Sequence, residues 1–523
     1  MKKRKSPNVS TQQDLVIVNP GSRQEIYQAL GRELTAIEPP LWAGMLATFA
    51  RNRGYSVSII DAEAENLSPT AVGERVASIN PRLLAVVVYG HQPSASTQNM
   101  TAAGQICRES KRLASDTPTL LIGGHVSALP ERTLREEGSD FVCQGEGAHT
   151  IAVLLEHLKA SGPALSDVPG LWYLAGGRVQ ANMPAPIIAD LDTDLPGVAW
   201  DLLPMERYRA HNWHCFNTSL NRQPYASIYT TLGCPYKCTF CCINAPFRLT
   251  PDRPNSYRFR GATRVLDELQ LLQEKYGVRN LKIADEMFVL NEKHVFAICD
   301  GIVERGLDFN IWAYARVDTV KDHFLDKLKA AGVNWLALGI ESASKHVRDG
   351  VEKGRFGSEQ IIEVVRKIEA AEINIIGNYI FGLPDDDQSS MQETLDLALE
   401  LRTDFGNFYS AMAYPGSKLY EMAVQQGWRL PPTWNGFSQH AVDTLPLPTE
   451  HVSASEVLRF RDHAFQVYFN DPAYLAKVTA RFGASTADHV REMAAVPLER
   501  RFADEAAVEA LGTPQQLDGR MAA

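Results

Sequence analysis

Short, continuous runs of apolar residues, separated by amphipathic helical segments, recur along most of the chain. In the first third predicted strands, most of them rich in apolar residues, lie at residues 15–19, 55–61, 83–89 and 119–123, and residues 40–51 form an amphipathic helical pattern. Strands that are apolar at every position are buried on both faces, which is typical of parallel sheets covered by helices. The first third is therefore predicted to be a doubly wound α/β domain that binds ligands at the carboxyl edge of its sheet.

The same alternation of strand and helix continues in the middle third. Predicted strands lie at residues 225–231, 280–284, 309–313, 335–339, 373–381 and 407–411, and polar residues collect just past the strand ends. This pattern predicts a partial (β/α)6 barrel of the TIM type, with functional residues at the carboxyl ends of its strands. Beyond Tyr414 the periodicity is helical and the composition is aromatic and polar, which predicts a helical C-terminal extension.

Composition shifts divide the chain into five expected parts. We expect a flexible basic tail at 1–12, the first domain at 13–162, a proline-spaced linker with a small hairpin at 163–222, the barrel at 223–420 and the helical extension at 421–523.

Length and charge narrow the class of protein. A chain of 523 residues is too long for one hydrophobic core, and a formal net charge of −10 argues against broad binding of nucleic acid. No apolar window reaches the length of a membrane span, and the basic start is not followed by the apolar region of a secretory leader. We therefore expect a cytoplasmic multidomain enzyme with neither nucleic acid nor membrane as a partner.

The most specific motif is a group of three cysteines on a loop. Cys234, Cys238 and Cys241 have the spacing CxxxCxxC and follow a short apolar strand, which Gly233 and Pro235 end. Three thiolates leave one iron of a 4Fe–4S cluster open for another ligand. A structural zinc site needs four ligands, usually in two pairs, and no second pair lies nearby.

The other cysteines carry no such pattern. Cys242 follows the motif directly and is interpreted as a packed or spare thiol. The remaining four are scattered through apolar or mixed segments, where a lone cysteine behaves as a small buried hydrophobe: Cys107, Cys143, Cys215 and Cys299.

The cysteine motif resembles that of the radical S-adenosylmethionine (SAM) superfamily. The resemblance implies that Cys234, Cys238 and Cys241 hold a 4Fe–4S cluster, whose open iron binds SAM and cleaves it to a 5′-deoxyadenosyl radical. It also implies that Phe240 packs near the adenine.

Residues after the later strands match the same superfamily one by one. The resemblance implies that Asp285 and Glu286 receive the amino end of SAM and that Arg316 holds its carboxylate, a task that suits a guanidinium. It places Gly339, Glu341 and Ser342 near the SAM ribose and methionine, and Gly382 at the turn on the adenine side. The alternative for each carboxylate is a helix cap or a surface ion pair.

Glycine-rich loops follow the strands of the first domain. The loops are Tyr89-Gly90-His91-Gln92, Gly123-Gly124-His125 and Gly145-Glu146-Gly147. Glycine lets the backbone approach a bulky ligand closely. These loops resemble those of the Rossmann-like cobalamin-binding domain that precedes many radical SAM domains; the alternative is an ordinary flavodoxin-like domain with tight turns.

One loop departs from the cobalamin pattern. Domains of the methionine synthase kind carry a cobalt-ligating histidine after the first strand, whereas this chain has Asn19-Pro20-Gly21-Ser22. Ligation of the lower face of cobalt from that loop is therefore excluded. His91 or Gln92 either lies below the corrin or is an ordinary polar loop residue.

Taken together, the chain resembles cobalamin-dependent radical SAM methyltransferases. The resemblance implies cobalamin, SAM and a 4Fe–4S cluster as cofactors, an electron donor such as flavodoxin or ferredoxin, and methylation of an unactivated carbon or phosphorus of a small metabolite. Catalytic and substrate-binding residues are not assigned. The alternatives are a non-methylating rearrangement, cyclisation or dehydration by the same architecture, and a non-enzymatic cobalamin or redox sensor. A methylthiotransferase is disfavoured, because only Cys107 and Cys143 lie in the first domain.

Overall fold

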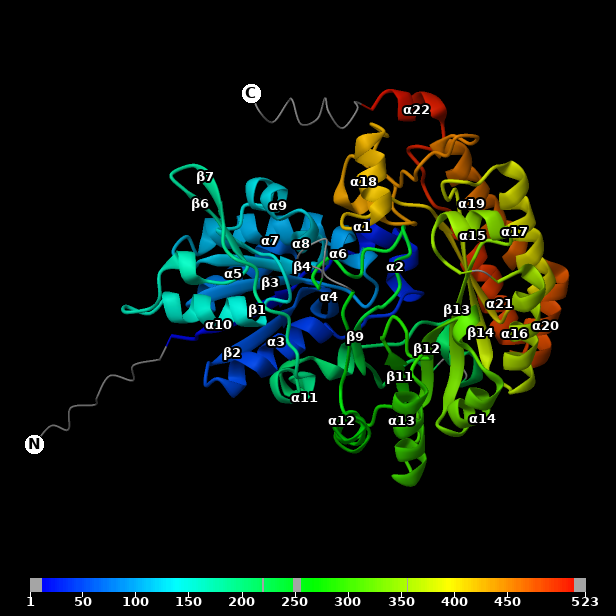
Figure 1. Ribbon diagram of the computed structural model, residues 1–523, viewed down its shortest axis with the longest axis horizontal. Helices are drawn as coiled ribbons and strands as arrows, with labels where there is room; N and C mark the ends of the chain where they lie inside the picture. The colour runs from blue at the N-terminus through cyan, green and yellow to red at the C-terminus, as the bar shows by residue number, and fades with distance from the viewer. Residues whose placement is uncertain (1–11, 219–220, 248–254, 355, 512–523) are drawn as a thin grey trace, which may run out of the picture.

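The computed structural model describes residues 12–218, 221–247, 255–354 and 356–511. The basic residues 2–5, expected to be a solvated tail, lie outside this part of the chain. Two sheets dominate the fold, one in each half of the molecule, and helices cover both (Figure 1). The fold class is α/β, as predicted.

The first sheet is a doubly wound parallel sheet. Its strands are β1 (Leu15–Asn19), β2 (Val57–Asp61), β3 (Leu83–Val88), β4 (Thr119–Gly123), β5 (Phe141–Cys143), β6 (Leu171–Ala175) and β7 (Arg178–Ala181). They are ordered β2-β1-β3-β4-β5-β6-β7, and β1 to β5 pair in parallel. The strand order reverses between β1 and β3, which is where such sheets bind ligands.

Alternate residues of these strands face two helical layers. Leu15, Ile17 and Ala85 pack against α3 (Leu41–Asn52) and α10 (Ala148–His157). The intervening residues, such as Val16 and Val86, pack against α5 (Pro69–Ile79) and α7 (Met100–Leu113). Burial on both faces explains why the central strands β1 and β3 are almost entirely apolar.

A hairpin extends this sheet beyond its parallel part. β6 pairs with β5, and β7 with β6, in antiparallel register. Both strands belong to residues 163–222, the predicted linker. That segment therefore adds two strands to the first sheet, and the exact division between domains stays a prediction.

The second sheet is the partial (β/α)6 barrel. Its strands are β8 (Tyr225–Ile228), β11 (Asn280–Ile283), β12 (Asn310–Arg316), β13 (Val333–Glu341), β14 (Asn374–Phe381) and β15 (Phe405–Ser410). They are ordered β15-β14-β13-β12-β11-β8 and every neighbouring pair is parallel. The connecting helices are α12 (Ala262–Tyr276), α13 (Glu292–Glu304), α14 (Asp322–Ala330), α15 (Lys345–Gly350), α16 (Ser358–Ala370) and α17 (Gln388–Leu401).

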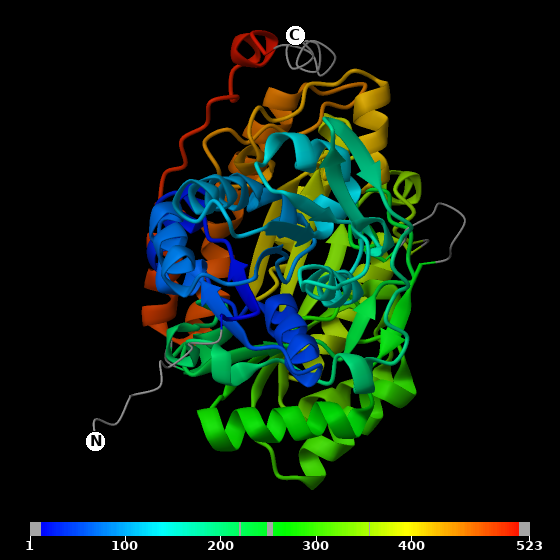
Figure 2. The ribbon, with the colours of Figure 1, turned by 90° about the vertical axis from the view of Figure 1, so that its left-hand side faces the viewer.

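The C-terminal extension is helical, as predicted. It contains α18 (Lys418–Gln425), α19 (Ala454–Phe469), α20 (Pro472–Phe482), α21 (Ala484–Ala494) and α22 (Glu505–Glu509). α19 packs against β15, so its buried residues join the core of the barrel. The first domain lies across the barrel (Figure 2).

Four short helices of the first domain and a short two-stranded ribbon beside the barrel lie near the carboxyl edges of the two sheets. They are α1 (Arg23–Tyr27), α2 (Leu30–Glu33), α6 (Ser94–Gln98), α8 (Gly124–Ala128) and the antiparallel pair β9 (Thr231–Gly233) and β10 (Tyr257–Phe259). Within the described part of the chain, no helix is both long and apolar enough to cross a membrane.

Candidate active site

A cavity of about 440 Å³ opens where the first domain, the barrel and the C-terminal extension meet. Tyr27 and Gln92 line it from the first domain, and His440 and Arg461 from the extension. The predicted site residues that line it are Gln92, Cys234, Cys238, Phe240, Cys241, Glu286, Arg316, Gly339 and Glu341.

The three predicted ligand cysteines lie on a loop that follows β9. Gly233, the last residue of β9, has a φ of 86°, and a Cβ there would lie 2.1 Å from the carbonyl oxygen of Ser256. Only glycine fits this turn without a clash. The turn leads directly into Cys234, Cys238 and Cys241, all of which line the cavity.

The three thiols line the same cavity but do not converge on a single metal-ion position. Among the described residues, no group of three histidine, cysteine or acidic side chains is arranged to hold a single metal ion. A four-iron cluster is larger than one ion, so its ligands need only face a common space. Burial raises the pKa of Cys234 to about 12 and the pKa of Cys241 well above its usual value, so metal binding must displace their protons. The donor set fits a cluster held by three thiolates.

Arg316, at the end of β12, lies directly beside the cysteine loop. Its Nη1 donates to the Cys238 sulfur at 3.5 Å, and its guanidinium lies over the Tyr236 ring, 3.9 Å from the centroid. Its Nε and Nη2 donate to the two carboxylate oxygens of Asp318, at 2.9 and 2.8 Å. In this structure the guanidinium fork therefore faces Asp318, and a role in holding the SAM carboxylate stays a prediction.

The carboxyl end of β13 forms the next part of the wall. Glu341 has a φ of 64°, unusual for a residue with a side chain, and its carboxylate pairs with Lys353. A Cβ on Gly339 would lie 2.7 Å from the Lys353 Nζ, so glycine leaves room for this pair. The Lys353 Nζ lies 5.9 Å from the centroid of the Phe240 ring.

The two adjacent acidic residues after β11 differ in role. Asp285 is buried, accepts hydrogen bonds from the backbone N–H and the hydroxyl of Thr230, and does not line the cavity. Glu286 lines the cavity, and burial raises its pKa to about 8 in spite of Lys282 and Lys353. Its carboxyl group is therefore largely protonated at neutral pH, and can donate a hydrogen bond.

Two other predicted contacts are packing residues in this structure. The Ser342 hydroxyl is buried and lies 3.2 Å from that of Thr394. Gly382 has a φ of 77°, and a Cβ there would lie 2.6 Å from a side-chain carbon of Val457 on α19. Glycine at 382 thus admits the extension helix.

The loop after β3 lines a second cavity of about 160 Å³, to which Tyr89, Gly90, His91 and Gln92 all contribute. The two cavities adjoin, because they share lining residues: Tyr27, Thr35, Gln92, Gln98 and His211. The Gln92 amide donates to the Tyr314 hydroxyl of the barrel at 3.3 Å. This loop therefore connects the sheet edge of the first domain to the barrel.

His91 is held by protein contacts. Its Nδ1 lies 3.0 Å from the Glu38 carboxylate and its Nε2 lies 2.7 Å from the Pro39 carbonyl oxygen. Nε2 is thus engaged by a hydrogen bond to the protein, whereas Nδ1 has only the nearby carboxylate, and a place for His91 below the corrin stays a prediction.

The Gly123-Gly124-His125 loop is packed under the extension. A Cβ on Gly123 would lie 2.3 Å from the Val88 carbonyl oxygen, whereas one on Gly124 would meet no atom closer than 3.6 Å. The His125 ring packs edge-on against Trp434 at 4.4 Å, and burial lowers the pKa of His125 to about 3. His125 is therefore a neutral packing residue here.

The Gly145-Glu146-Gly147 loop is tied down in the same way. One Glu146 oxygen accepts from Arg258 at 2.7 Å and the other from the backbone N–H of Ile188 at 2.6 Å. The N–H of Gly145 donates to the Ser127 hydroxyl at 3.0 Å, and Gly147, with a φ of 93°, precedes α10. These three residues line neither cavity, and their contact with cobalamin stays a prediction.

The carboxyl edge of the first sheet has glycine-containing segments and adjoining cavities, a feature that a large flat ligand requires. A Cβ on Gly124 would meet only ordinary contacts with Ser96, at 3.6 Å, and the loop after β3 opens on two adjoining cavities. A corrin needs such bare backbone at the carboxyl edge of the sheet.

Several cavity residues were not predicted from the sequence. They are Tyr27, His211, Lys353, Asn378, Tyr409, His440 and Arg461. One signal was available for Arg461: it falls at helical spacing with the buried residues Val457, Leu458 and Ala464, and an arginine on an apolar face needs a partner. The others lie at the end of a short helix (Tyr27), on loops or on strand positions, where no periodicity singles them out.

Comparison with known proteins matches both halves of the chain. The family model of the B12 binding domain matches residues 27–155, and that of the radical SAM superfamily matches residues 228–398. An uncharacterised methyltransferase of Pyrococcus horikoshii is 27% identical over 464 residues, which are 88% of this chain and 94% of that protein. The anaerobic magnesium-protoporphyrin IX monomethyl ester cyclase of Cereibacter sphaeroides is 25% identical over 415 residues, 78% of this chain and 63% of that protein.

A solved structure shares the fold over almost the full length. TsrM of Kitasatospora setae, a radical SAM methyltransferase solved with its tryptophan substrate and a SAM analogue, aligns with a TM-score of 0.64. The alignment covers 98% of this chain and 100% of that chain at 17% identity. At this identity the likeness concerns the order and arrangement of the domains.

Proposed function

Because the chain belongs to the radical SAM enzymes that carry an N-terminal B12-binding domain, we propose that it methylates an unactivated carbon or phosphorus of a small metabolite. The observation that carries this proposal is the junction of two cavities, one at the sheet edge of the B12-binding domain and one holding the three cysteines. They share Tyr27, Gln92 and His211, so two cofactors and a substrate have adjoining space.

The cofactors of this family are a 4Fe–4S cluster, SAM and cobalamin, as predicted. When bound, the cluster and SAM supply a radical that removes hydrogen, and cobalamin supplies the methyl group. In our proposal Cys234, Cys238 and Cys241 hold the cluster. Phe240, Gly339 and Glu341, which line the same wall, are the residues that would orient SAM.

The remaining side chains position the substrate and keep water out. Glu286, largely protonated at neutral pH, offers a hydrogen bond inside the cavity. Tyr27 and the segment of Ser438, Gln439 and His440 line the cavity where the first domain meets the extension. An enclosed site protects a reactive intermediate from solvent.

The proposal includes a supply of single electrons. A small electron-transfer protein such as flavodoxin or ferredoxin suits this task. We place the enzyme in the cytoplasm, because free thiols and an oxygen-sensitive cluster persist in a reducing compartment.

Anaerobic reconstitution with iron, sulfide and hydroxocobalamin tests the proposal. We expect the wild-type protein to bind one corrin and about four irons, and to form 5′-deoxyadenosine from SAM after reduction. Cys238→Ala should bind the corrin but form no 5′-deoxyadenosine. Cys299→Ala, which removes a buried thiol of α13, is the matched control and should behave as wild type.

The products formed from SAM and the substrate distinguish a methyltransferase from the alternative functions. With a methylated substrate, S-adenosylhomocysteine and 5′-deoxyadenosine should form in comparable amounts. SAM cleavage by a protein that binds no corrin would remove the methyltransferase proposal. A bound corrin without SAM cleavage would favour a sensor.

A non-methylating reaction is the second candidate. The similarity to the magnesium-protoporphyrin IX monomethyl ester cyclase favours it, because that relative is named as a cyclase and not as a methyltransferase. Formation of 5′-deoxyadenosine together with a changed but unmethylated substrate would select this alternative.

A further inference from the structure

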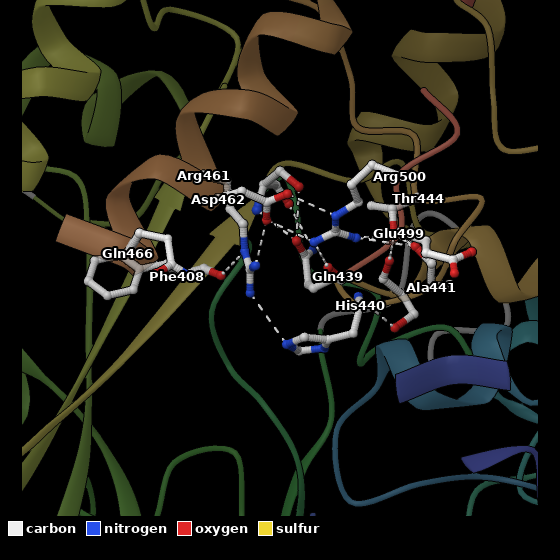
Figure 3. A network of polar contacts seen from close by, with 12 residues as sticks. Phe408, Gln439, His440, Ala441, Thr444, Arg461, Asp462, Gln466, Glu499 and Arg500 are labelled. Carbon is white, nitrogen blue, oxygen red and sulfur yellow. Dashed lines mark hydrogen bonds and ion pairs between the residues drawn. The ribbon is translucent and has the colours of Figure 1, made fainter. Parts of the chain in front are cut away.

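Arg461 is a buried cation that faces the cavity from the extension. It lies on α19, is 3% exposed, and lines the cavity together with His440. Its Nε donates to the Phe408 carbonyl oxygen at 2.8 Å, and its Nη1 to Asp462 Oδ1 at 2.8 Å (Figure 3). Its Nη2 donates to His440 Nε2 at 3.3 Å. These bonds use three of the five N–H groups of a guanidinium.

The carboxylate beside Arg461 is shared with a second arginine. Arg500 donates from Nε and Nη2 to the two oxygens of Asp462, both at 2.8 Å. Although burial raises the pKa of Asp462, Arg500 and Arg461 hold this pKa below its usual value, so the group stays ionised. The other contacts of Arg500 are with the carbonyl oxygens of Gln439 and Ala441 and the hydroxyl of Thr444 (Figure 3). Two cations therefore share one anion, which leaves one positive charge in excess.

His440 does not cancel this charge. A guanidinium can only donate, so Nε2 of His440 accepts and its ring proton lies on Nδ1. Burial, then Arg461 and Arg500, hold the pKa of His440 well below its usual value, so the ring is neutral. Because His440 lines the cavity, its Nδ1–H is a donor that an anion bound there could use.

The other charged residues of the described cavity wall are matched. Glu341 pairs with Lys353, and Arg316 pairs with Asp318. Glu286 is largely protonated at neutral pH. The excess charge beside Arg461 thus has no counterpart among the described residues that line the cavity.

We propose that Arg461 and His440 form an anion subsite, and hence that the substrate carries a carboxylate, phosphate or phosphonate group. A buried charge is costly unless it is paired, and a guanidinium suits an oxyanion geometrically. The aromatic residues Phe408 and Phe465 line the cavity beside it, so the anion would be held at an apolar wall. This inference rests on the proposed function, because it names the class of substrate for the same cavity.

Titration of the reconstituted, corrin-loaded protein with inorganic phosphate tests the subsite. The probe is the phosphorus NMR signal, and the proteins are wild type, Arg461→Gln and Arg459→Gln. Arg459 lies on the same helix but is exposed and does not line the cavity, so it is the matched control. We expect saturable broadening for wild type and Arg459→Gln, and binding weaker by about tenfold or more for Arg461→Gln. Equal binding by all three proteins would overturn the inference.

The same preparations show whether the anionic group that binds the subsite belongs to the substrate, to cobalamin or to SAM. Corrin content by absorbance and SAM binding by equilibrium dialysis should be unchanged in Arg461→Gln. A loss of either would assign the subsite to the phosphate of cobalamin or the carboxylate of SAM, and would overturn the assignment to substrate.

A second measurement does not depend on the variant folding. In the wild-type protein, reduction to paramagnetic cob(II)alamin should accelerate the relaxation of phosphate bound in this cavity. No acceleration would mean that phosphate binds elsewhere, and the inference would fail. Corrin content and SAM cleavage are measured separately from phosphate binding. A failure of the anion subsite therefore leaves the proposed function intact, and a failure of the proposed function is seen without the phosphate titration.

Discussion

Glycine at position 123 meets a steric requirement of the sheet edge. Its φ of 168° is extended backbone that any residue adopts, so conformation does not demand glycine. The available space does demand glycine, because a Cβ would lie 2.3 Å from the carbonyl oxygen of Val88, the last residue of the neighbouring strand β3. The ends of β3 and β4 can therefore pair at this position only when residue 123 has no side chain.

The variant Gly123→Ala should destabilise the protein by about 1–3 kcal/mol, the usual cost of an atom forced into a packed region. Gly357→Ala is the control, because its Cβ would meet no atom within 4 Å; it changes only the N-cap of α16, so its effect should stay below about 1 kcal/mol. Urea unfolding of both variants measures the difference. Similar free energies of unfolding for the two would show that β3 and β4 adapt to the extra carbon.

At the scale of elements, α19 links the extension to the barrel and to the cavity. It begins with a capping box, in which the Ser453 hydroxyl accepts from the Glu456 N–H and the Glu456 carboxylate accepts from the Ser453 N–H. Eight residues later Arg461 reaches the Phe408 carbonyl oxygen of β15. The start of this helix thus helps to place the cation of the cavity.

Ser453→Ala should lower the free energy of unfolding by about 1 kcal/mol, because the first turn of α19 loses its side-chain acceptor. Ser166→Ala, at an exposed site outside any α-helix, should change it by less than about 0.5 kcal/mol. Urea midpoints at neutral pH provide the measurement. An unchanged midpoint for Ser453→Ala would indicate that water replaces the cap.

At the scale of the whole molecule, an ion pair between a buried lysine and a partly buried glutamate joins the first domain to the barrel. Glu38 accepts from the Lys282 Nζ on β11 at 2.9 Å and from the Tyr225 hydroxyl at 3.1 Å, and it also contacts His91. The Lys282 side chain is 1% exposed. Although burial opposes ionisation, His91 and Lys282 hold the pKa of Glu38 well below its usual value.

Glu38→Gln should destabilise the protein by about 3 kcal/mol at neutral pH, because it leaves Lys282 buried without its anion. The pKa of Glu38 is lower in the folded state, so its contribution is complete above its usual pKa of 4.5 and is lost as pH falls through the folded value. The difference between wild type and variant should therefore narrow below about pH 4.5, in thermal unfolding measured from neutral to acidic pH.

The control for this prediction is a surface pair. Glu65→Gln removes the partner of Arg75, whose side chain is 43% exposed, and should cost at most about 1 kcal/mol. An equally small effect of Glu38→Gln at neutral pH would mean that water enters the domain interface when the carboxylate is removed.

Local sequence patterns determined the architecture of this protein. Strands that are apolar at nearly every position, such as 15–19 and 83–88, indicated parallel sheets, because burial on both faces favours such runs. The spacing of Cys234, Cys238 and Cys241 indicated the cluster, because the loop itself carries all three ligands. These features depend on neighbours within one element or one turn, so they can be read without the fold.

Only the tertiary structure decided which polar residues face the cavity. His125 and Gln92 both follow strands of the first sheet in glycine-containing segments, yet His125 packs against Trp434, whereas Gln92 reaches Tyr314 of the barrel. Arg461 and His440 form a subsite because α19 lies against β15 and the 438–441 segment folds over it. Periodicity tells which face of an element is buried but not what buries it, and the partners of these residues lie on other elements, often in another domain.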